Sequence, residues 1–242
     1  MSNIYDNHQE ENLPDEKPSE KFWRILWYNK GKLIWLNVLV VACSLPIITV
    51  GPVMTAMMYV LREIVDERLT YTTSDFFLAF KKNWKQALPI GILHVGFTIA
   101  IGFAAWYYYA WLSQKSEGGV FAALAATIVV LILFLMAVAG IYLYQLISGC
   151  QLSSKDLIKD AIYLGIIELK SNAVTVLIML AIILLLLSPT LFISVWFYPI
   201  SLLLVALVGL TIPNYIAVYR SKKHIAKYVT DPYYQNISDI NE

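Results

Sequence analysis

The stretch LNVLVVACSLPIITVGPVMTAMMYV, residues 36–60, is apolar enough to lie in a membrane, but its centre is interrupted. Pro46 and Pro52 have no N–H to donate, and Gly51 tolerates positive φ, so the chain can reverse here. A continuous helix over 33–61 would be roughly 43 Å long, more than the ~30 Å hydrocarbon core requires. The stretch therefore predicts a helical hairpin that re-enters the membrane. The alternative is a kinked single span that places the amino terminus outside.

Composition assigns the rest of the chain to the same environment. Of its 242 residues 59% are hydrophobic and 14% charged, whereas soluble domains carry about 25% charged residues. The apolar runs are continuous rather than alternating, which disfavours a strand-built barrel. The sequence predicts an all-α, polytopic transmembrane helical bundle with the broken first segment and four firm spans. These spans are expected at 87–112, 120–147, 173–190 and about 200–219.

Polar segments divide the chain. An acidic, disordered tail is expected over residues 1–20, a single membrane domain over 21–219, and a basic, then polar, tail over 220–242. Two short interfacial helices are predicted before membrane segments, one capped by Ser19 and one over 74–86 capped by Ser74. Residues 148–172 form a third amphipathic stretch that returns to water.

The basic residues support the hairpin. If residues 33–61 dip in and return, 17 of the 18 Lys and Arg residues lie on one side and only Lys115 on the other. A single span divides them 12 to 6. Because cytoplasmic loops are enriched in Lys and Arg, the hairpin is favoured and both termini are predicted to be cytoplasmic.

Two groups of residues are candidates for structural or binding roles near this hairpin. Ser44 and Thr49 can satisfy carbonyls that the prolines leave free in the turn. The 74–86 helix carries aromatic and basic residues together, a pattern that fits a partner helix, anionic lipid or simply an elbow into a span. The turn residues are Ser44, Pro46, Thr49, Gly51 and Pro52, and the surface residues are Phe77, Lys81, Lys82, Trp84 and Lys85.

Asn37, His94 and Gln145 are polar residues at or near membrane depth. Interhelical hydrogen bonds account for the two amides without a substrate. For His94 two interpretations stay open: a neutral imidazole bonded between helices, or a member of a proton relay, since ionisable groups inside membranes are costly and often functional.

The sequence contains no catalytic constellation. It has no Gly-rich phosphate loop, no His-Glu-x-x-His and no Gly-x-Ser-x-Gly, and Cys43 and Cys150 lack metal-ligand spacing. The net charge of +1 argues weakly against nucleic-acid binding. We therefore expect a non-enzymatic protein without metal or cofactor, whose surroundings are the lipid bilayer.

The first apolar segment and the helix after it resemble the YesL-like family of small bacterial membrane proteins. The shared features are a Leu-Asn start, a Cys-Ser-Leu-Pro-Ile-x-Thr-x-Gly-Pro core and a Phe-Phe-x-x-Phe-Lys-x-Asn-Phe-Lys-Gln helix, in which Trp84 replaces the more usual Phe. The matching residues are Leu36, Asn37, Cys43, Ser44, Leu45, Pro46, Ile47, Thr49, Gly51, Pro52, Phe76, Phe77, Phe80, Lys81, Asn83, Lys85 and Gln86.

This resemblance implies a multi-pass protein of the bacterial cytoplasmic membrane with uncharacterised function. Members are often encoded beside carbohydrate importers of the ATP-binding-cassette type and their sensor-regulators. Two hypotheses follow: an accessory or regulatory partner of a carbohydrate importer or its sensor, and a small transporter or channel. The sequence leaves the oligomeric state open.

Overall fold

In a computed structural model, residues 16–113, 119–150, 153–190 and 195–230 are described, and these form helices and no strand. Residues 1–15 of the expected disordered tail lie outside these ranges, as do residues 231–242 of the carboxyl-terminal tail, whereas residues 18–20 of the expected tail begin the first helix. The main helices are α1 (Pro18–Tyr28), α2 (Lys30–Cys43), α3 (Val50–Val65), α4 (Thr72–Ser113), α5 (Gly119–Gly149), α6 (Ser154–Ile167), α7 (Leu169–Ser188), α8 (Tyr198–Leu204) and α9 (Thr211–Ile225).

The expected polytopic helical bundle is confirmed. Five helical segments are long and apolar enough to cross a membrane: Ile47–Val65, Thr72–Trp111, Ala123–Gly149, Leu169–Ser188 and Tyr198–Val229. The first segment differs from three of the others. In its most apolar stretch of 18 residues 56% is buried, against 17% in the corresponding stretches of α4, α5 and α7. The segment containing α3 therefore contributes to the core of the bundle, whereas α4, α5 and α7 turn most of their surface outward.

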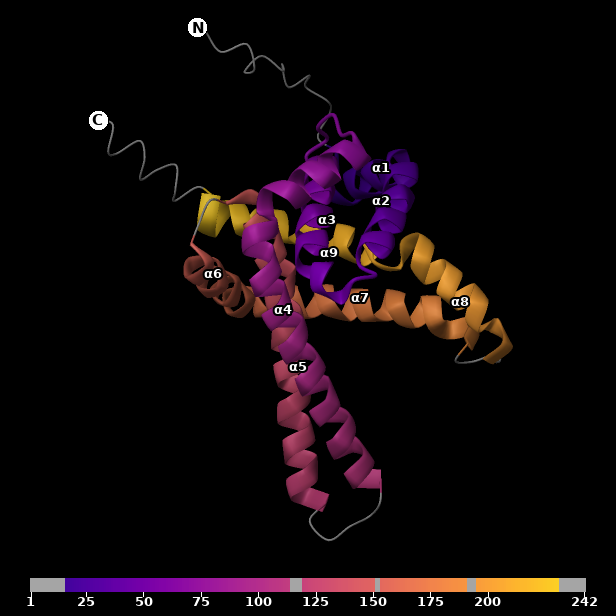
Figure 1. Ribbon diagram of the computed structural model, residues 1–242, viewed down its shortest axis with the longest axis vertical. Helices are drawn as coiled ribbons and strands as arrows, with labels where there is room; N and C mark the ends of the chain where they lie inside the picture. Colours follow the sequence, from indigo (N-terminus) through magenta and orange to yellow (C-terminus); the bar gives the residue numbers. More distant parts are fainter. Residues whose placement is uncertain (1–15, 114–118, 151–152, 191–194, 231–242) are drawn as a thin grey trace, which may run out of the picture.

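The first apolar segment is a hairpin. α2 and α3 are joined by residues 44–49, which include the 3₁₀ turn Ile47–Thr49, and the chain reverses there (Figure 1). Glu67, which follows α3, forms ion pairs with Lys21 and Arg24, which precede α2, at 2.9 and 2.8 Å. Since both ends of the segment meet, it is not the kinked single span considered as the alternative.

α3 and α4 pack backbone to backbone where the hairpin begins its return. Gly51 of α3 lies against Ala87 and Gly91 of α4, and a Cβ on either glycine would overlap the opposite main chain. The absence of side chains therefore allows the close approach. Above this contact Met57, Val60 and Leu61 are fully buried, and α3 also contacts α5 and α9.

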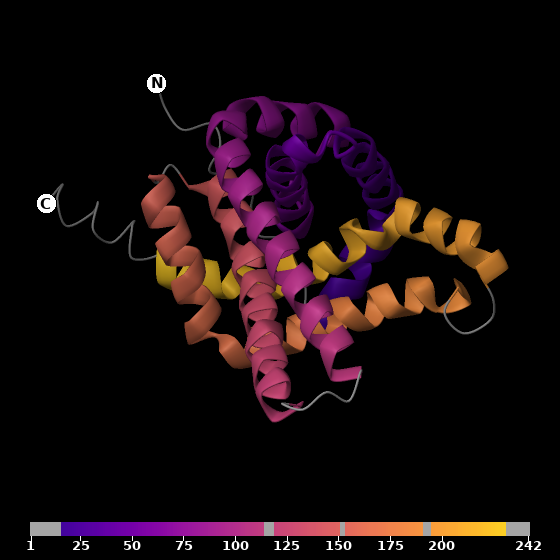
Figure 2. The same cartoon turned by 60° about the horizontal axis from the view of Figure 1, so that its bottom comes forward.

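The predicted elbow over 74–86 is not a separate helix. It is the first part of α4, which continues through Pro89 into the second apolar segment and is bent (Figure 2). Proline cannot donate to the carbonyl four residues earlier, which is a usual cause of such a bend. The expected caps were also wrong: α1 begins at Pro18 after Lys17, and α4 begins at Thr72, with Asp75 accepting from the Tyr71 N–H.

Two further hairpins extend from the region around α1, α3 and α9 (Figure 1). α4 pairs with α5 in one direction, and α7 pairs with α8 in another (Figures 1 and 2). Between α8 and α9 the last helix opens into a π-helical turn, Val205–Gly209. It then continues beyond Tyr219, the expected end of the final span, to Ile225.

Candidate functional site

The turn of the first hairpin is held by its own side chains. The Thr49 hydroxyl donates to the carbonyls of Cys43 and Pro46, at 2.6 Å each, as expected for a residue that satisfies freed carbonyls. The Thr49 N–H also donates to Pro46, and the Ser44 N–H closes α2 by donating to Val40. The reversal is therefore a defined turn, anchored at its α3 end by the packing of Gly51 and Pro52, which are buried.

The tip of this hairpin is apolar and exposed. Leu45, Ile47 and Ile48 are 79%, 69% and 60% exposed, and Pro46 between them is exposed as well. The two arms behind the tip are well covered, since Leu36 and Val40 of α2 and Val53 of α3 are fully buried. The hairpin thus presents an uncovered apolar end on a packed stem.

The predicted surface on the first turns of α4 is exposed along its whole length. Phe77 and Trp84 are 40% and 46% exposed, whereas Phe76 and Ala79 turn toward the core. We call this exposed set the α4 face. It consists of Phe77, Lys81, Lys82, Trp84 and Lys85.

Asn37 lies at the junction of the hairpin with the last helix. Its side chain is fully buried and makes four hydrogen bonds to the π-helical turn. The amide donates to the carbonyls of Val205 and Ala206 at 3.1 and 2.6 Å, and its oxygen accepts from the N–H groups of Leu210 and Thr211 at 2.9 Å each. Asn37 therefore satisfies the backbone that the π turn exposes, and fastens α2 to the helix break.

His94 and Gln145 also bond between or within helices. Nδ1 of His94 lies 2.9 Å from the Tyr144 hydroxyl, and Nε2 lies 3.2 Å from the Met136 carbonyl. A carbonyl only accepts, so Nε2 donates to Met136, and a neutral imidazole would accept at Nδ1 from the Tyr144 hydroxyl. Gln145 is buried, donates to Ile141 and accepts from Ser221 of α9.

Sequence reasoning missed a further buried amide, Asn172. Asn172, in the first turns of α7, donates to the carbonyls of Leu164 and Gly165 and accepts from the Tyr142 hydroxyl at 2.7 Å. It therefore joins α5, α6 and α7 at one point. The sequence signal for this role was the position of Asn172 at the polar start of an apolar segment. The same position is equally typical of an exposed residue.

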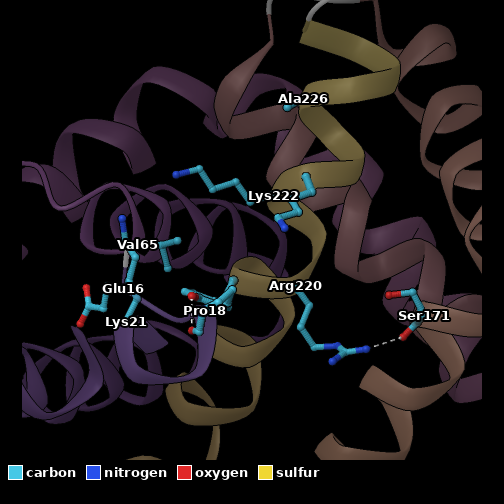
Figure 3. Close-up of a pocket in the computed structure, with 10 residues that line it drawn as sticks. Glu16, Pro18, Lys21, Val65, Ser171, Arg220, Lys222 and Ala226 are labelled. Atoms are coloured by element: carbon cyan, nitrogen blue, oxygen red, sulfur yellow. Dashed lines mark hydrogen bonds between the residues drawn. The ribbon is translucent and has the colours of Figure 1, made fainter. Parts of the chain in front are cut away.

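Sequence reasoning also missed a pocket of about 520 Å³ between α1, α9 and the start of α7. Its polar lining is mainly basic: Lys21, Arg220, Lys222 and Lys223 face it with a single acid, Glu16. Figure 3 shows Arg220 extended toward Ser171 on one side, with Glu16, Pro18 and Lys21 on the other.

The acids near this pocket are already paired with bases. Glu16 bonds to Arg24 and Glu67 bonds to Arg24 and Lys21, and these contacts lower the pKa of both carboxyls. Glu67 adopts a left-handed φ of 56°, in a cap where Arg68 N–H donates to Glu63 and Glu67 N–H to Ile64. A glycine is usual at this position, so the ion pairs accompany a strained backbone.

Metal-binding chemistry has no counterpart in the ranges that the structure describes. No group of three or more His, Cys, Asp or Glu side chains is placed there to hold an ion. Cys43 and Cys150 are free, half-buried thiols.

Comparison with known proteins places similarity where the hairpin lies. Residues 33–107 match the model of a family described as a protein of unknown function, DUF624, and the YesL-like family is one of the DUF624 families. The match covers α3, nearly all of α2 and most of α4, which is less than half of the chain. No curated protein and no solved structure matches significantly. The hairpin and the helix packed against it are thus similar to a family whose function is unknown.

Proposed function

We propose that this protein is a non-enzymatic accessory protein of the bacterial cytoplasmic membrane, which binds another membrane protein through the hairpin tip and the adjoining α4 face. The observation that carries the proposal is the exposed apolar tip, Leu45, Ile47 and Ile48. The argument depends on how deep this tip lies in the membrane.

Aromatic residues give that depth, because Trp and Tyr concentrate at both membrane–water interfaces. On α4, Trp84 and Trp106 are separated by roughly 33 Å along a helix axis, close to the ~30 Å hydrocarbon core. Gly91, which packs against Gly51, lies roughly 10 Å beyond Trp84. The hairpin tip extends past Gly51, so it reaches toward the middle of the bilayer.

A turn at this depth needs cover from protein. Non-helical backbone is tolerated inside a bilayer only where protein or a water-filled cavity surrounds it, since lipid cannot hydrogen-bond to it. Thr49 satisfies part of this turn, but the residues from Leu45 to Ile48 remain uncovered in the single chain. A partner's transmembrane segment packed on the tip would supply the cover.

The intramembrane polar residues favour this proposal over transport by the chain itself. Asn37, His94 and Gln145 each bond to neighbouring helices or their own. Transporters usually gather several such groups around a substrate near the midplane. The YesL-like resemblance, rather than the geometry, suggests a carbohydrate importer or its sensor as the partner, and the sidedness of the basic residues suggests cytoplasmic termini.

Cross-linking from the tip tests the proposal directly. A photoreactive phenylalanine is placed at Ile48, or at Ile99 of α4 as a control that is equally exposed, at 60% and 62%. We expect illumination of intact membranes to give a discrete adduct with another membrane protein from position 48 only. Adducts with lipid alone at both positions would refute the proposal. A cross-linked dimer of this chain would also refute it, because the tip would then bind a second copy of the chain.

The α4 face is tested by substitution. Phe77, Lys81 and Trp84 are changed together to alanine, and Phe103, Lys159 and Trp106 provide a control of the same residue types on other exposed surfaces. The first variant should insert normally but lose at least about tenfold in recovery of the partner cross-linked at Ile48, as expected for loss of interface anchors. Equal recovery from both variants would remove the α4 face from the interface.

A further inference from the structure

The basic pocket between α1, α7 and α9 carries an inference that is independent of the proposed function. Its four bases are not equivalent. Lys21 forms an ion pair with Glu67, and Lys222 with Asp66. Arg220 and Lys223 form no ion pair within the described part of the chain, although both line the same pocket. Among the described residues, two positive charges of the pocket therefore have no ion-pair partner.

The Arg220 side chain is held in place by neutral groups. Its Nε donates to the Thr175 hydroxyl at 2.8 Å, and its Nη2 lies 3.5 Å from the Ser171 carbonyl (Figure 3). Both partners belong to α7, so the guanidinium is oriented before any ligand arrives. A half-buried guanidinium whose acceptors are neutral is stabilised more by an added anion than one that already has a carboxylate partner. Its planar fork suits phosphate oxygens.

The starts of two helices add partial positive charge to that of the basic side chains around the pocket. Pro18 is the first residue of α1, and Ser171 lies in the first turn of α7. Pro18 has no N–H, and the Glu20 and Lys21 N–H groups donate to the Lys17 carbonyl, so α1 contributes only the partial positive charge of a helix start. The volume of about 520 Å³ is within the usual range for small-ligand pockets, roughly 300–1,000 Å³.

We propose that this pocket binds a phosphate-bearing anion, with Arg220 and Lys223 as its contacting cations. α7 is a candidate membrane span that begins at Leu169, so the pocket lies at the end of a span, where lipid headgroups are found. Both a phospholipid headgroup and a free phosphate can supply the required chemistry.

The test uses the full chain in neutral detergent micelles and two probes. Inorganic phosphate is titrated by calorimetry, and bound phosphatidylglycerol is counted against phosphatidylcholine by native mass spectrometry. We expect selective binding of one or both anions, weakened at least about tenfold in the Arg220→Gln, Lys223→Gln double variant. Lipid binding alone would assign a headgroup site, and phosphate binding alone a soluble anion.

A matched control separates the pocket from general surface charge. Lys155→Gln with Lys159→Gln removes two exposed lysines of α6 and should leave both affinities within about twofold. Lys223→Gln alone breaks no ion pair among the described residues and gives a second pocket variant if the Arg220 change impairs folding. It should weaken binding of the same probe at least about threefold. Binding of neither anion, or equal loss in both double variants, would overturn the proposal.

Discussion

Replacing Asn37, the one Asn or Gln of the hairpin, with alanine should strongly destabilise the fold. The side chain is fully buried, and its four bonds fasten α2 to the π-helical turn before α9. Truncation leaves two carbonyls and two N–H groups without these partners in a site that water does not reach. The loss falls on the contact between the first hairpin and the last helix.

The expected magnitude follows from these four bonds. Interhelical hydrogen bonds in membrane proteins average about 0.6 kcal/mol, and net intramolecular bonds in general contribute about 1 kcal/mol. Asn37→Ala should therefore lower the free energy of unfolding by roughly 2–4 kcal/mol. Asn37→Asp keeps the acceptor for Leu210 and Thr211 but loses the donor and buries a charge, so it should not restore stability.

Reversible unfolding in mixed micelles, followed by tryptophan fluorescence, measures this loss. Asn83→Ala is the control, since that amide donates only to Ala79 of its own helix and should cost no more than about 0.5 kcal/mol. If Asn37→Ala unfolds within about 0.5 kcal/mol of the wild-type protein, the bonds to the π turn do not hold the bundle together.

Three further outcomes are expected. Gly91→Ala should lower the free energy of unfolding by at least about 2 kcal/mol or prevent folding, because its Cβ would overlap Gly51. Gly102→Ala is the control, since its Cβ meets open space and should be neutral. Comparable melting temperatures of the two variants would contradict the close packing. The Glu67→Gln variant should be less stable than Glu67→Gly, since both lose the ion pairs but only glycine relieves the left-handed strain. Because the pKa of Glu67 is lowered, the stabilisation that its carboxylate provides should be complete above pH 4.5 and lost on acidification below it, as thermal melts can show. Cysteine introduced at Asn12 should resist an impermeant maleimide in intact cells, and labelling from outside would refute cytoplasmic termini.

Hydropathy and charge sidedness predicted the main architecture. The apolar segments appear as α4, α5, α7 and the α8–α9 region, and the Pro and Gly residues of SLPIITVGP mark the reversal. Local capping was less predictable. Ser74 has the residue type of an N-cap, but Asp75 accepts from the Tyr71 N–H and starts α4 earlier. Asp75 acts from inside the first turn by accepting from the N–H before the helix, so the position of a capping-type residue such as Ser74 does not by itself mark the helix start.

Long-range pairings were beyond the same reasoning. Asn37 was recognised as an interhelical residue, but its partners lie in VALVGLT, an apolar stretch whose composition gives no sign of a π turn. The pocket was missed for a similar reason. Its bases come from α1 and α9, at opposite ends of the sequence, and each basic run reads separately as an ordinary membrane-flanking segment.

The reversal at residues 44–49 links these features. Because the hairpin returns, Glu67 can reach Lys21 and Arg24, and Asp66 can reach Lys222 of α9. Tyr219 also donates to the Pro18 carbonyl, so the ends of the described chain meet on one side (Figure 1). A single crossing over the same residues would carry Asp66 and Glu67 to the far side and leave Lys21, Arg24 and Lys222 without them. The basic pocket between α1 and α9 and the exposed apolar tip therefore depend on the same turn.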